Sequence, residues 1–159
     1  MFIFHITKKS LRIAGLVLLA VILLVLFLFF ANKNLQSSDN DWLLAGYPDG
    51  TTPAQQQTFL RGYGWEVDPA PLAVRDIVIP SEFDDVYEEY NQIQRTQGFD
   101  LCEFKEETVS LITYNVINYQ GAATQVTASL LVCRGKIIGG DISSSDAENG
   151  FTLGFKLEG

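Results

Sequence analysis

An uncharged run of 19 residues near the start of the sequence places the strongest constraint on how this chain can fold. Residues 13–31 carry no acidic or basic side chain. A helix rises about 1.5 Å per residue, so the run is long enough to span the hydrocarbon core of a bilayer, about 30 Å thick. Three basic residues precede the run and one follows it closely. Because basic residues remain on the cytoplasmic side, we expect a single-pass protein of the cell membrane, with a cytoplasmic tail at 1–12 and residues 32–159 outside.

The competing interpretation of this run is a signal peptide that is removed after export. A signal peptide has a shorter apolar region, about 7–15 residues, and ends in a cleavage site with small residues at alternate positions. Here the bulky Phe29 and Phe30 stand directly before Ala31. We therefore favour a retained transmembrane anchor, with the membrane as its partner.

Charge is divided unevenly between the two sides of the predicted anchor. Residues 1–31 hold three basic residues and no acids, whereas the rest of the chain holds 8 Lys and Arg against 19 Asp and Glu, a net charge of −11. We expect so acidic a domain to bind no nucleic acid, because it repels phosphate groups. It also repels anionic lipid headgroups, so the domain is expected to stand away from the bilayer surface.

Beyond the anchor, the sequence predicts a polar juxtamembrane linker over 32–52 and a folded extracytoplasmic domain over 53–159. A short helix should open the domain, because Pro53 suits the first helical position and Thr51 or Thr52 can cap it. An extended segment follows, is interrupted by two prolines, and resumes as a strand that leads into the next helix.

The second helix is predicted over residues 81–97, where its start, its apolar face and its end agree. Ser81 is a favourable N-cap, and the acidic residues after it suit the positive end of the helix dipole. Apolar and aromatic side chains recur every three or four residues from Phe83 to Ile93, which is the spacing of one helical face. Gly98 can adopt the left-handed conformation that ends a helix.

The remainder of the chain is typical of antiparallel β-strands separated by tight turns. Strands are predicted at about 108–119, 124–133, 136–142 and 151–157. The second alternates cleanly, with one apolar face made of Val126, Ala128, Leu130 and Val132. Gly139 and Gly140 inside the third predict a bulge or a close backbone approach. The expected fold class is α+β: a β-meander of three to four strands whose apolar face is covered by the helix 81–97.

Tyr87, Tyr90 and Asn91 are the binding residues that the predicted helix suggests. The two tyrosines allow an aromatic platform for a sugar or a peptide. We favour the alternative that their rings pack on the sheet with the hydroxyl groups at its rim, as amphipathic aromatic residues usually do. The acidic residues of the same helix are expected to form a solvated face.

The sequence contains no recognisable catalytic, cofactor or metal site. Its only histidine is His5, which precedes the anchor, so residues 32–159 offer no imidazole for a nucleophilic triad or a zinc site. The loop at 141–150 has oxygen ligands at alternate positions but lacks the glycine and glutamate of a calcium-binding EF-hand. We therefore expect no cofactor and no metal.

Cys102 and Cys133 are the two cysteines, and both are predicted to lie outside the membrane. An oxidising compartment permits a disulfide between them, which would close a loop of about 30 residues and contribute about 3 kcal/mol in the chain-entropy model. Nothing in the spacing shows that the two thiols are close. We favour two unpaired cysteines.

Four patterned segments lie in or next to the predicted helices and strands. They are Phe59-Leu60-x-x-Tyr63-Gly64-Trp65-Glu66-Val67, Tyr90-Asn91-x-x-Gln94-x-x-Gln97-Gly98-Phe99-Asp100-Leu101, Gly139-Gly140-Asp141 and Gly150-Phe151-x-x-Gly154-Phe155. Together they resemble a bacterial family named domain of unknown function 4830, over about residues 53–156. The resemblance implies small membrane-anchored or lipid-anchored proteins of Firmicutes-type bacteria. It implies no activity, cofactor or binding residue.

Two functions remain open at this point. The favoured one is a non-catalytic extracytoplasmic domain that binds a membrane protein or another envelope component. The alternative is an envelope hydrolase that uses carboxylates alone, which requires two acids converging in a cleft against the helix.

Overall fold

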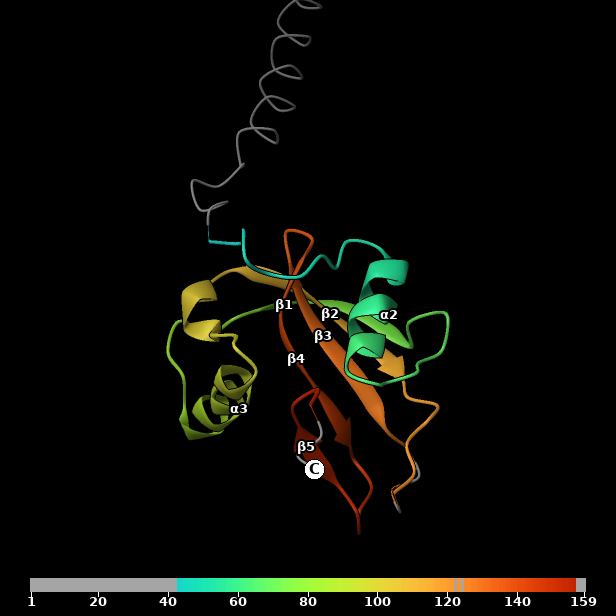
Figure 1. Cartoon of the computed structure of the whole chain (residues 1–159). Coiled ribbons are helices and arrows are strands. Elements are labelled where there is room, and N and C mark those ends of the chain that lie inside the picture. The colour runs from blue at the N-terminus through green and yellow to red at the C-terminus, as the bar shows by residue number, and fades with distance from the viewer. Residues whose placement is uncertain (1–42, 122, 124, 157–159) are drawn as a thin grey trace, which may run out of the picture. The chain divides into compact units, whose positions relative to one another are not determined.

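The computed structural model describes residues 43–121, 123 and 125–156 (Figure 1). The chain divides into two units, Met1–Ala45 and Gly46–Gly159, and the second contains all the elements discussed below. The predicted tail, the predicted anchor and most of the predicted linker lie outside the described residues. Within the described ranges, no helix is long and apolar enough to cross a membrane.

The second unit is built on an antiparallel sheet whose five strands follow one another in chain order. The strands are β1 (Ala73–Val78), β2 (Thr108–Asn115), β3 (Thr127–Cys133), β4 (Lys136–Ser144) and β5 (Phe151–Leu153). The helices are α2 (Pro53–Gly62), α3 (Asp85–Thr96) and the 3-10 helix η1 (Leu101–Phe104). The α+β class and the antiparallel meander are confirmed, but the sheet has five strands instead of three to four. The additional strand is β1, which pairs with β2 along its whole length.

Helix α2 begins at Pro53, as the sequence predicts. Its N-cap is Thr52, whose hydroxyl oxygen accepts the N–H of Gln55 at 3.3 Å, while the Gln55 side chain accepts the N–H of Thr52 at 2.9 Å. This capping box satisfies two backbone donors of the first turn. Leu60 is fully buried and Gln56 nearly so, which shows the face of α2 that lies against the sheet.

Helix α3 begins four residues later than predicted. Its N-cap is Asp84, whose Oδ1 accepts the N–H of Tyr87 at 2.8 Å, whereas the expected cap, Ser81, lies in a bend. Asp and Ser are about equally good caps, so residue type alone does not choose between them. The later start places Phe83 just before the cap, where its ring packs on Tyr87 with 4.5 Å between centroids. Gly98 follows the helix at a φ of 88°, as predicted.

The two helices cover opposite faces of the sheet (Figure 1), which corrects the prediction that the helix 81–97 covers its one apolar face. The predicted apolar face packs instead against α2, in one core with Leu60 and Trp65. Helix α3 and η1 lie on the other face, where Leu131 and Cys133 are only 2% and 1% exposed. Both residues alternate with the predicted apolar face and were not assigned to it. The strand is covered on both sides, so both of its faces are buried.

The β3–β4 hairpin contains the irregularity that Gly139 and Gly140 predict. Leu131 pairs with Gly139, but the residue after Leu131 pairs with Ile137, so one residue of β4 is left over as a β-bulge. Gly140 has a φ of 150°, and a Cβ on it would overlap the carbonyl oxygen of Ser129. Only glycine fits this position without distorting the sheet.

The chain in front of α2 belongs to the folded unit, although the sequence predicts a linker there. Gly50 donates its N–H to the carbonyl oxygen of Gly135, and Ile137 donates to that of Pro48, both at 2.8 Å. These bonds lay the segment 48–50 along the first residues of β4. The folded part therefore begins several residues before the helix that was expected to open it.

Candidate functional site

Tyr90 of α3 reaches a buried carboxylate of β4. Its hydroxyl group donates to Oδ1 of Asp141 at 2.9 Å, and the Asp141 side chain is also hydrogen-bonded to Ser143. Asp141 is one of the few buried polar residues, with 7% of its surface exposed. The Tyr90 hydroxyl is thus used inside the domain, and the preferred interpretation of this tyrosine, packing against the sheet, agrees with the contact.

Gln94 of α3 and Gln97, the C-cap of the helix, bind backbone groups at the edge of β4 between the segment 48–50 and β5. The fully buried Gln94 accepts the N–H of Gly140 through Oε1 at 2.8 Å. Gln97 donates through Nε2 to the carbonyl oxygen of Gly140 at 3.1 Å and accepts the N–H of Phe155 at 2.6 Å. These side chains replace the neighbouring strand that this part of the edge lacks among the described residues. Sequence analysis placed both glutamines in a family pattern but assigned them no role.

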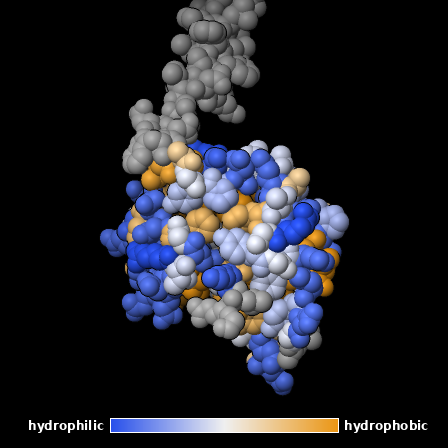
Figure 2. Space-filling view, viewed as in Figure 1, coloured by the Kyte–Doolittle hydropathy of each residue, from blue (hydrophilic) through white to orange (hydrophobic). Residues whose placement is uncertain are grey.

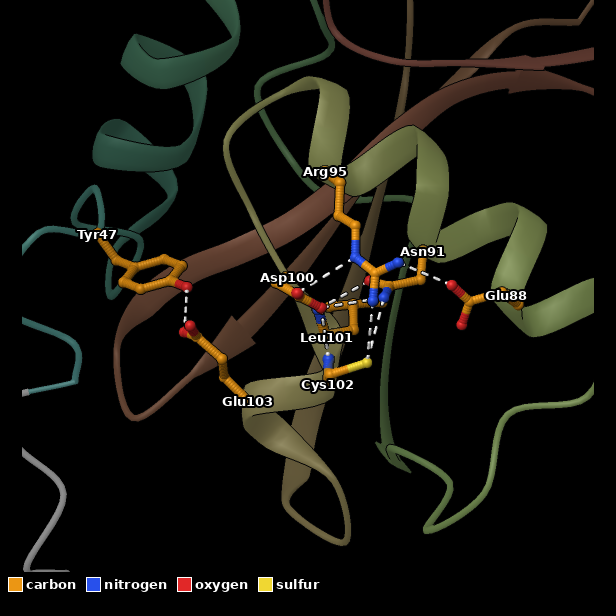
Figure 3. Close-up of polar contacts among 8 residues, drawn as sticks. All are labelled: Tyr47, Glu88, Asn91, Arg95, Asp100, Leu101, Cys102 and Glu103. Atoms are coloured by element: carbon orange, nitrogen blue, oxygen red, sulfur yellow. Dashed lines mark hydrogen bonds and ion pairs between the residues drawn. The ribbon is translucent and has the colours of Figure 1, made fainter.

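Asn91 and Arg95 join α3 to the start of η1 (Figure 3). Asn91 is fully buried; its Oδ1 accepts the N–H of Leu101 at 2.8 Å and its Nδ2 donates to Asp100 at 3.0 Å. Arg95 forms ion pairs with Glu88 at 2.8 Å and with Asp100 at 3.2 Å. We call Tyr90, Asn91, Gln94 and Gln97 the α3 polar cluster.

The pKa values of Asp100 and Asp141 are shifted in opposite directions. Burial alone would raise the pKa of Asp100, but hydrogen bonds from Asn91, from the N–H of Cys102 and from Arg95 outweigh it and lower that pKa to about 2. At Asp141 burial dominates and raises the carboxyl pKa, although the hydrogen bonds from Ser143 and Tyr90 oppose it.

The phenolic groups on this side of the sheet are harder to ionise than usual. Burial is the main reason that the pKa of Tyr90 lies well above its ordinary value, and the Asp141 carboxylate adds to the effect. Burial and a hydrogen bond to Glu103 raise the pKa of Tyr47 to about 12. The Tyr47 ring packs against Phe104 at 5.5 Å between centroids, and Figure 3 shows its hydroxyl group directed at Glu103. At neutral pH both tyrosines are hydrogen-bond donors and not bases.

Tyr87, the third predicted binding residue, is half-buried. Its ring packs between Phe83, at 4.5 Å, and Tyr90, at 6.2 Å, and burial raises the pKa of its hydroxyl group. The polar groups of Asn91 and Tyr90 form hydrogen bonds inside the domain. Among the residues that the structure describes, every buried side-chain nitrogen and oxygen has a partner. Each side chain of the α3 polar cluster thus makes at least one hydrogen bond within the domain, so the cluster helps to hold the fold together.

Both cysteines are free thiols in the structure. Cys102 Sγ accepts hydrogen bonds from Arg95 at 3.3 Å and from Asn91 at 3.5 Å. Cys133 is buried in β3, and burial is the main cause that raises the pKa of its thiol. A thiol with a raised pKa is a poor nucleophile at neutral pH. The disulfide between the two residues was the alternative not favoured from the sequence, and a thiol count can test it.

An open groove of about 580 Å³ lies beside α2. It is lined by Pro48, Asp49, Ala54, Gln55, Thr58, Phe59, Gly62 and Tyr63. The rings of Phe59 and Tyr63 meet at 5.2 Å and both contact Phe155, at 5.1 and 5.6 Å between centroids. Tyr63 is 39% exposed, so part of an aromatic wall faces solvent.

The sequence does not reveal this groove, because its walls come from two parts of the chain that were interpreted separately. Phe59 and Tyr63 are four residues apart, a spacing that places them on one side of α2 and the one signal that could have indicated an aromatic strip. The opposite wall, Pro48 and Asp49, lies in the predicted linker. The face of the domain drawn in Figure 2 is mostly hydrophilic, with hydrophobic residues in small separate patches.

Residues 59–142, more than half of the chain, match the family model named Domain of unknown function (DUF4830). The chain belongs to this family. The resemblance expected from the sequence is thereby confirmed. The DUF4830 match contains the whole α3 polar cluster together with Gly140 and Asp141, but only the C-terminal part of the groove lining. No curated protein and no solved structure matches the chain.

Proposed function

We propose that this chain is a single-pass membrane protein whose extracytoplasmic domain binds a protein partner and catalyses no reaction. The groove beside α2 is the observation that carries the proposal. Its volume of about 580 Å³ is in the usual range of ligand sites, about 300–1,000 Å³, and its walls combine aromatic rings with a few polar groups, as such sites do. The anchor at 13–31 would keep this groove within reach of other membrane or envelope proteins.

The polar groups of the groove favour a polypeptide over a glycan as its occupant. Asp49 is paired with Lys136 at 2.6 Å. Gln55 completes the capping box, and the Thr58 hydroxyl group donates to the carbonyl oxygen of Ala54 at 2.7 Å. Because these side chains are already engaged, the groove mainly offers apolar surface. That surface suits an aliphatic or aromatic side chain of a protein better than the hydroxyl groups of a sugar.

The alternative, a hydrolase that uses carboxylates alone, finds less support. Such an enzyme needs two acids directed at one point of a substrate. The side-chain hydrogen bonds of the buried Asp141 go to Tyr90 and Ser143, not to a second acid. Within the described ranges, no group of three or more His, Cys, Asp or Glu residues is arranged to hold a metal ion.

A site-specific photo-crosslinking experiment tests the binding proposal. A photoreactive residue replaces Thr58, in the groove, or Glu89, exposed on α3, in the full-length chain in its native membrane. We expect one discrete protein adduct from position 58 that is absent from position 89. The adduct should be lost when Ala54→Arg blocks the groove and kept with Gln92→Arg, which makes the same charge change on α3. Equal products from both positions, or glycan adducts at position 58, would contradict the proposal.

The predicted topology has its own test. A phosphatase that is active only outside the cytoplasm is fused after residue 159. We expect activity with the native anchor and its loss when the basic residues are moved from before to after residues 13–31. An inactive native fusion that is nevertheless produced in full length would refute the extracytoplasmic placement.

A further inference from the structure

Strand β1 forms an open edge of the sheet. It pairs with β2 on one side, and in the described part of the chain no strand pairs with its other side. The N–H of Val116, at the end of β2, bonds to the carbonyl oxygen of Val126 at 2.9 Å, so the even-numbered residues of β2 direct their backbone groups towards β3. Its odd-numbered residues therefore bond to β1, where they face Ala73, Arg75 and Ile77.

It follows that Val74, Asp76 and Val78 direct their N–H and C=O groups away from the sheet. Unpaired groups of this kind are a template for another strand. The register places these three residues opposite even-numbered residues of β2, so their side chains share one face. Val74 and Val78 are 57% and 60% exposed, and the exposed Asp76 accepts a hydrogen bond from Ser110 at 2.9 Å. The edge thus presents an apolar, acidic, apolar pattern.

A second copy of this chain fits that pattern poorly. Two β1 strands aligned on the same three residues would set Asp76 of each chain directly opposite the other. Like charges in directly opposed positions destabilise an antiparallel pair. A charge in the middle of an edge strand is also a common means of preventing self-association.

We propose that the β1 edge binds an extended segment of a partner protein in which apolar, basic and apolar side chains alternate. The segment adds an antiparallel strand to the sheet, with main-chain hydrogen bonds supplying affinity and side chains supplying selectivity. A Lys or Arg lies opposite Asp76, and aliphatic residues lie beside Val74 and Val78. The net charge of −11 on residues 32–159 attracts such a segment from a distance. This site is separate from the groove beside α2 and does not depend on the function proposed for it.

A labelled peptide, Thr-Val-Thr-Lys-Thr-Val-Thr, tests the proposal by fluorescence anisotropy against the full chain in nanodiscs of neutral lipid. Replacing the Lys by Glu should weaken binding about fivefold, as expected for exchanging an attractive cross-strand pair for a repulsive one. Asp76→Asn should reduce this preference and Asp76→Lys should reduce it further, because the cross-strand attraction is lost while the remaining negative charge of the domain still favours the Lys peptide. A preference that is unchanged in Asp76→Asn would overturn the proposal.

N-methylated peptides test whether the backbone carries the interaction. In the proposed register the Val and Lys residues of the peptide direct their N–H groups at β1, and the Thr residues direct theirs away. N-methylation of the Val and Lys residues should abolish binding, whereas N-methylation of the inner Thr residues should leave it intact. Equal binding of the two peptides would refute strand addition. Loss of binding in Ala54→Arg would place the peptide in the groove instead, and would also overturn the proposal.

Discussion

The face of the sheet under α2 and the face under α3 are both buried, but different interactions hold them. Under α2, Leu60 and Trp65 join a continuous hydrophobic core with Tyr114 and Ile142. Under α3, the contacts with β4 are made by the glutamines and Tyr90 of the α3 polar cluster, which bond to Gly140 and Asp141.

The comparison shows that the interactions that contribute most stability need not be the ones that fix the position of a helix. Burial of an aliphatic side chain contributes about 1.5–3 kcal/mol and has little directional preference. A hydrogen bond contributes a net of about 0.5–1.5 kcal/mol but requires a defined distance and angle. We infer that the α2 face supplies most of the stability, while the α3 polar cluster fixes where the helix lies relative to the bulge in β4.

Gly140→Ala should disturb the packing on both faces of the sheet and cause the largest loss of stability. The added methyl group would overlap the carbonyl oxygen of Ser129 and press on the Phe155 ring, at a φ that L-residues avoid. Backbone strain and overpacking together predict a loss of about 4 kcal/mol in the free energy of unfolding, measured by urea denaturation with tryptophan fluorescence. Gly62→Ala is the control, because a Cβ there meets nothing within 4 Å and should stabilise α2 by up to about 1 kcal/mol. Similar losses in both variants would contradict this account.

Leu60→Ala should weaken the α2 face alone. Leu60 is fully buried, and removing a buried aliphatic side chain of this size costs about 3 kcal/mol through lost burial and a residual cavity. Val86→Ala on α3 is the matched control, because Val86 is 75% exposed and should change stability by less than about 0.5 kcal/mol. The same denaturation measurement applies. A Leu60→Ala loss no larger than the control would show that α2 is not part of the core.

Gln94→Met should weaken the α3 face by a smaller amount. The substitution keeps the volume but leaves the buried N–H of Gly140 without its acceptor, which costs about 2 kcal/mol. Hydrogen exchange at the Gly140 amide should also accelerate more than exchange on the α2 face. Gln92→Met, exposed on the same helix, is the control. Unchanged exchange at Gly140 would disprove the assigned role.

Asp100 and Asp141 should give opposite slopes of stability against pH, which is the smallest of these effects. The pKa of Asp100 is lowered to about 2, so the folded state binds fewer protons than the unfolded state between about pH 2 and 4, and stability falls as the pH drops through this window. Asp100→Asn should make the fall in the free energy of unfolding about 1 kcal/mol smaller. This value allows for solvent screening, because the carboxyl group is about a third exposed.

The raised pKa of Asp141 has the reverse consequence. The folded state binds more protons than the unfolded state from the ordinary carboxyl pKa up to the raised one, so stability falls as the pH rises through that window. Asp141→Asn should remove this slope. Denaturation curves from pH 2 to 7 on the wild type and both variants measure the two effects, and slopes of the same sign would contradict the shifts.

Local signals predicted the elements, but not how they are layered. The cap at Thr52, the stop at Gly98 and the bulge at Gly139 depend on nearby backbone geometry, so residue type was sufficient to indicate them. Which helix covers which face depends on contacts between distant residues. The alternation in β3 suggested one apolar face, because nothing local records that Leu131 is also buried.

The roles of the predicted site residues likewise depend on contacts with distant residues, which the local sequence does not show. Tyr90 and Asn91 have the composition of a binding surface, and only their distant partners, Asp141 and Leu101, show that they act inside the fold. The groove beside α2 was not predicted for a related reason: Pro48 and Tyr63 both line it but come from segments of the chain that were interpreted separately.

The segment 48–50 also has a mechanical consequence. It forms one wall of the groove and is held to the β3–β4 hairpin by two backbone hydrogen bonds and the ion pair between Asp49 and Lys136. Tension applied from the N-terminal side of the domain reaches these bonds before it loads any strand of the sheet. Peeling the segment from β4 would remove the wall that Pro48 supplies while the five strands stay paired. The occupancy of the groove should therefore decrease under a pulling force well below the one that unfolds the domain.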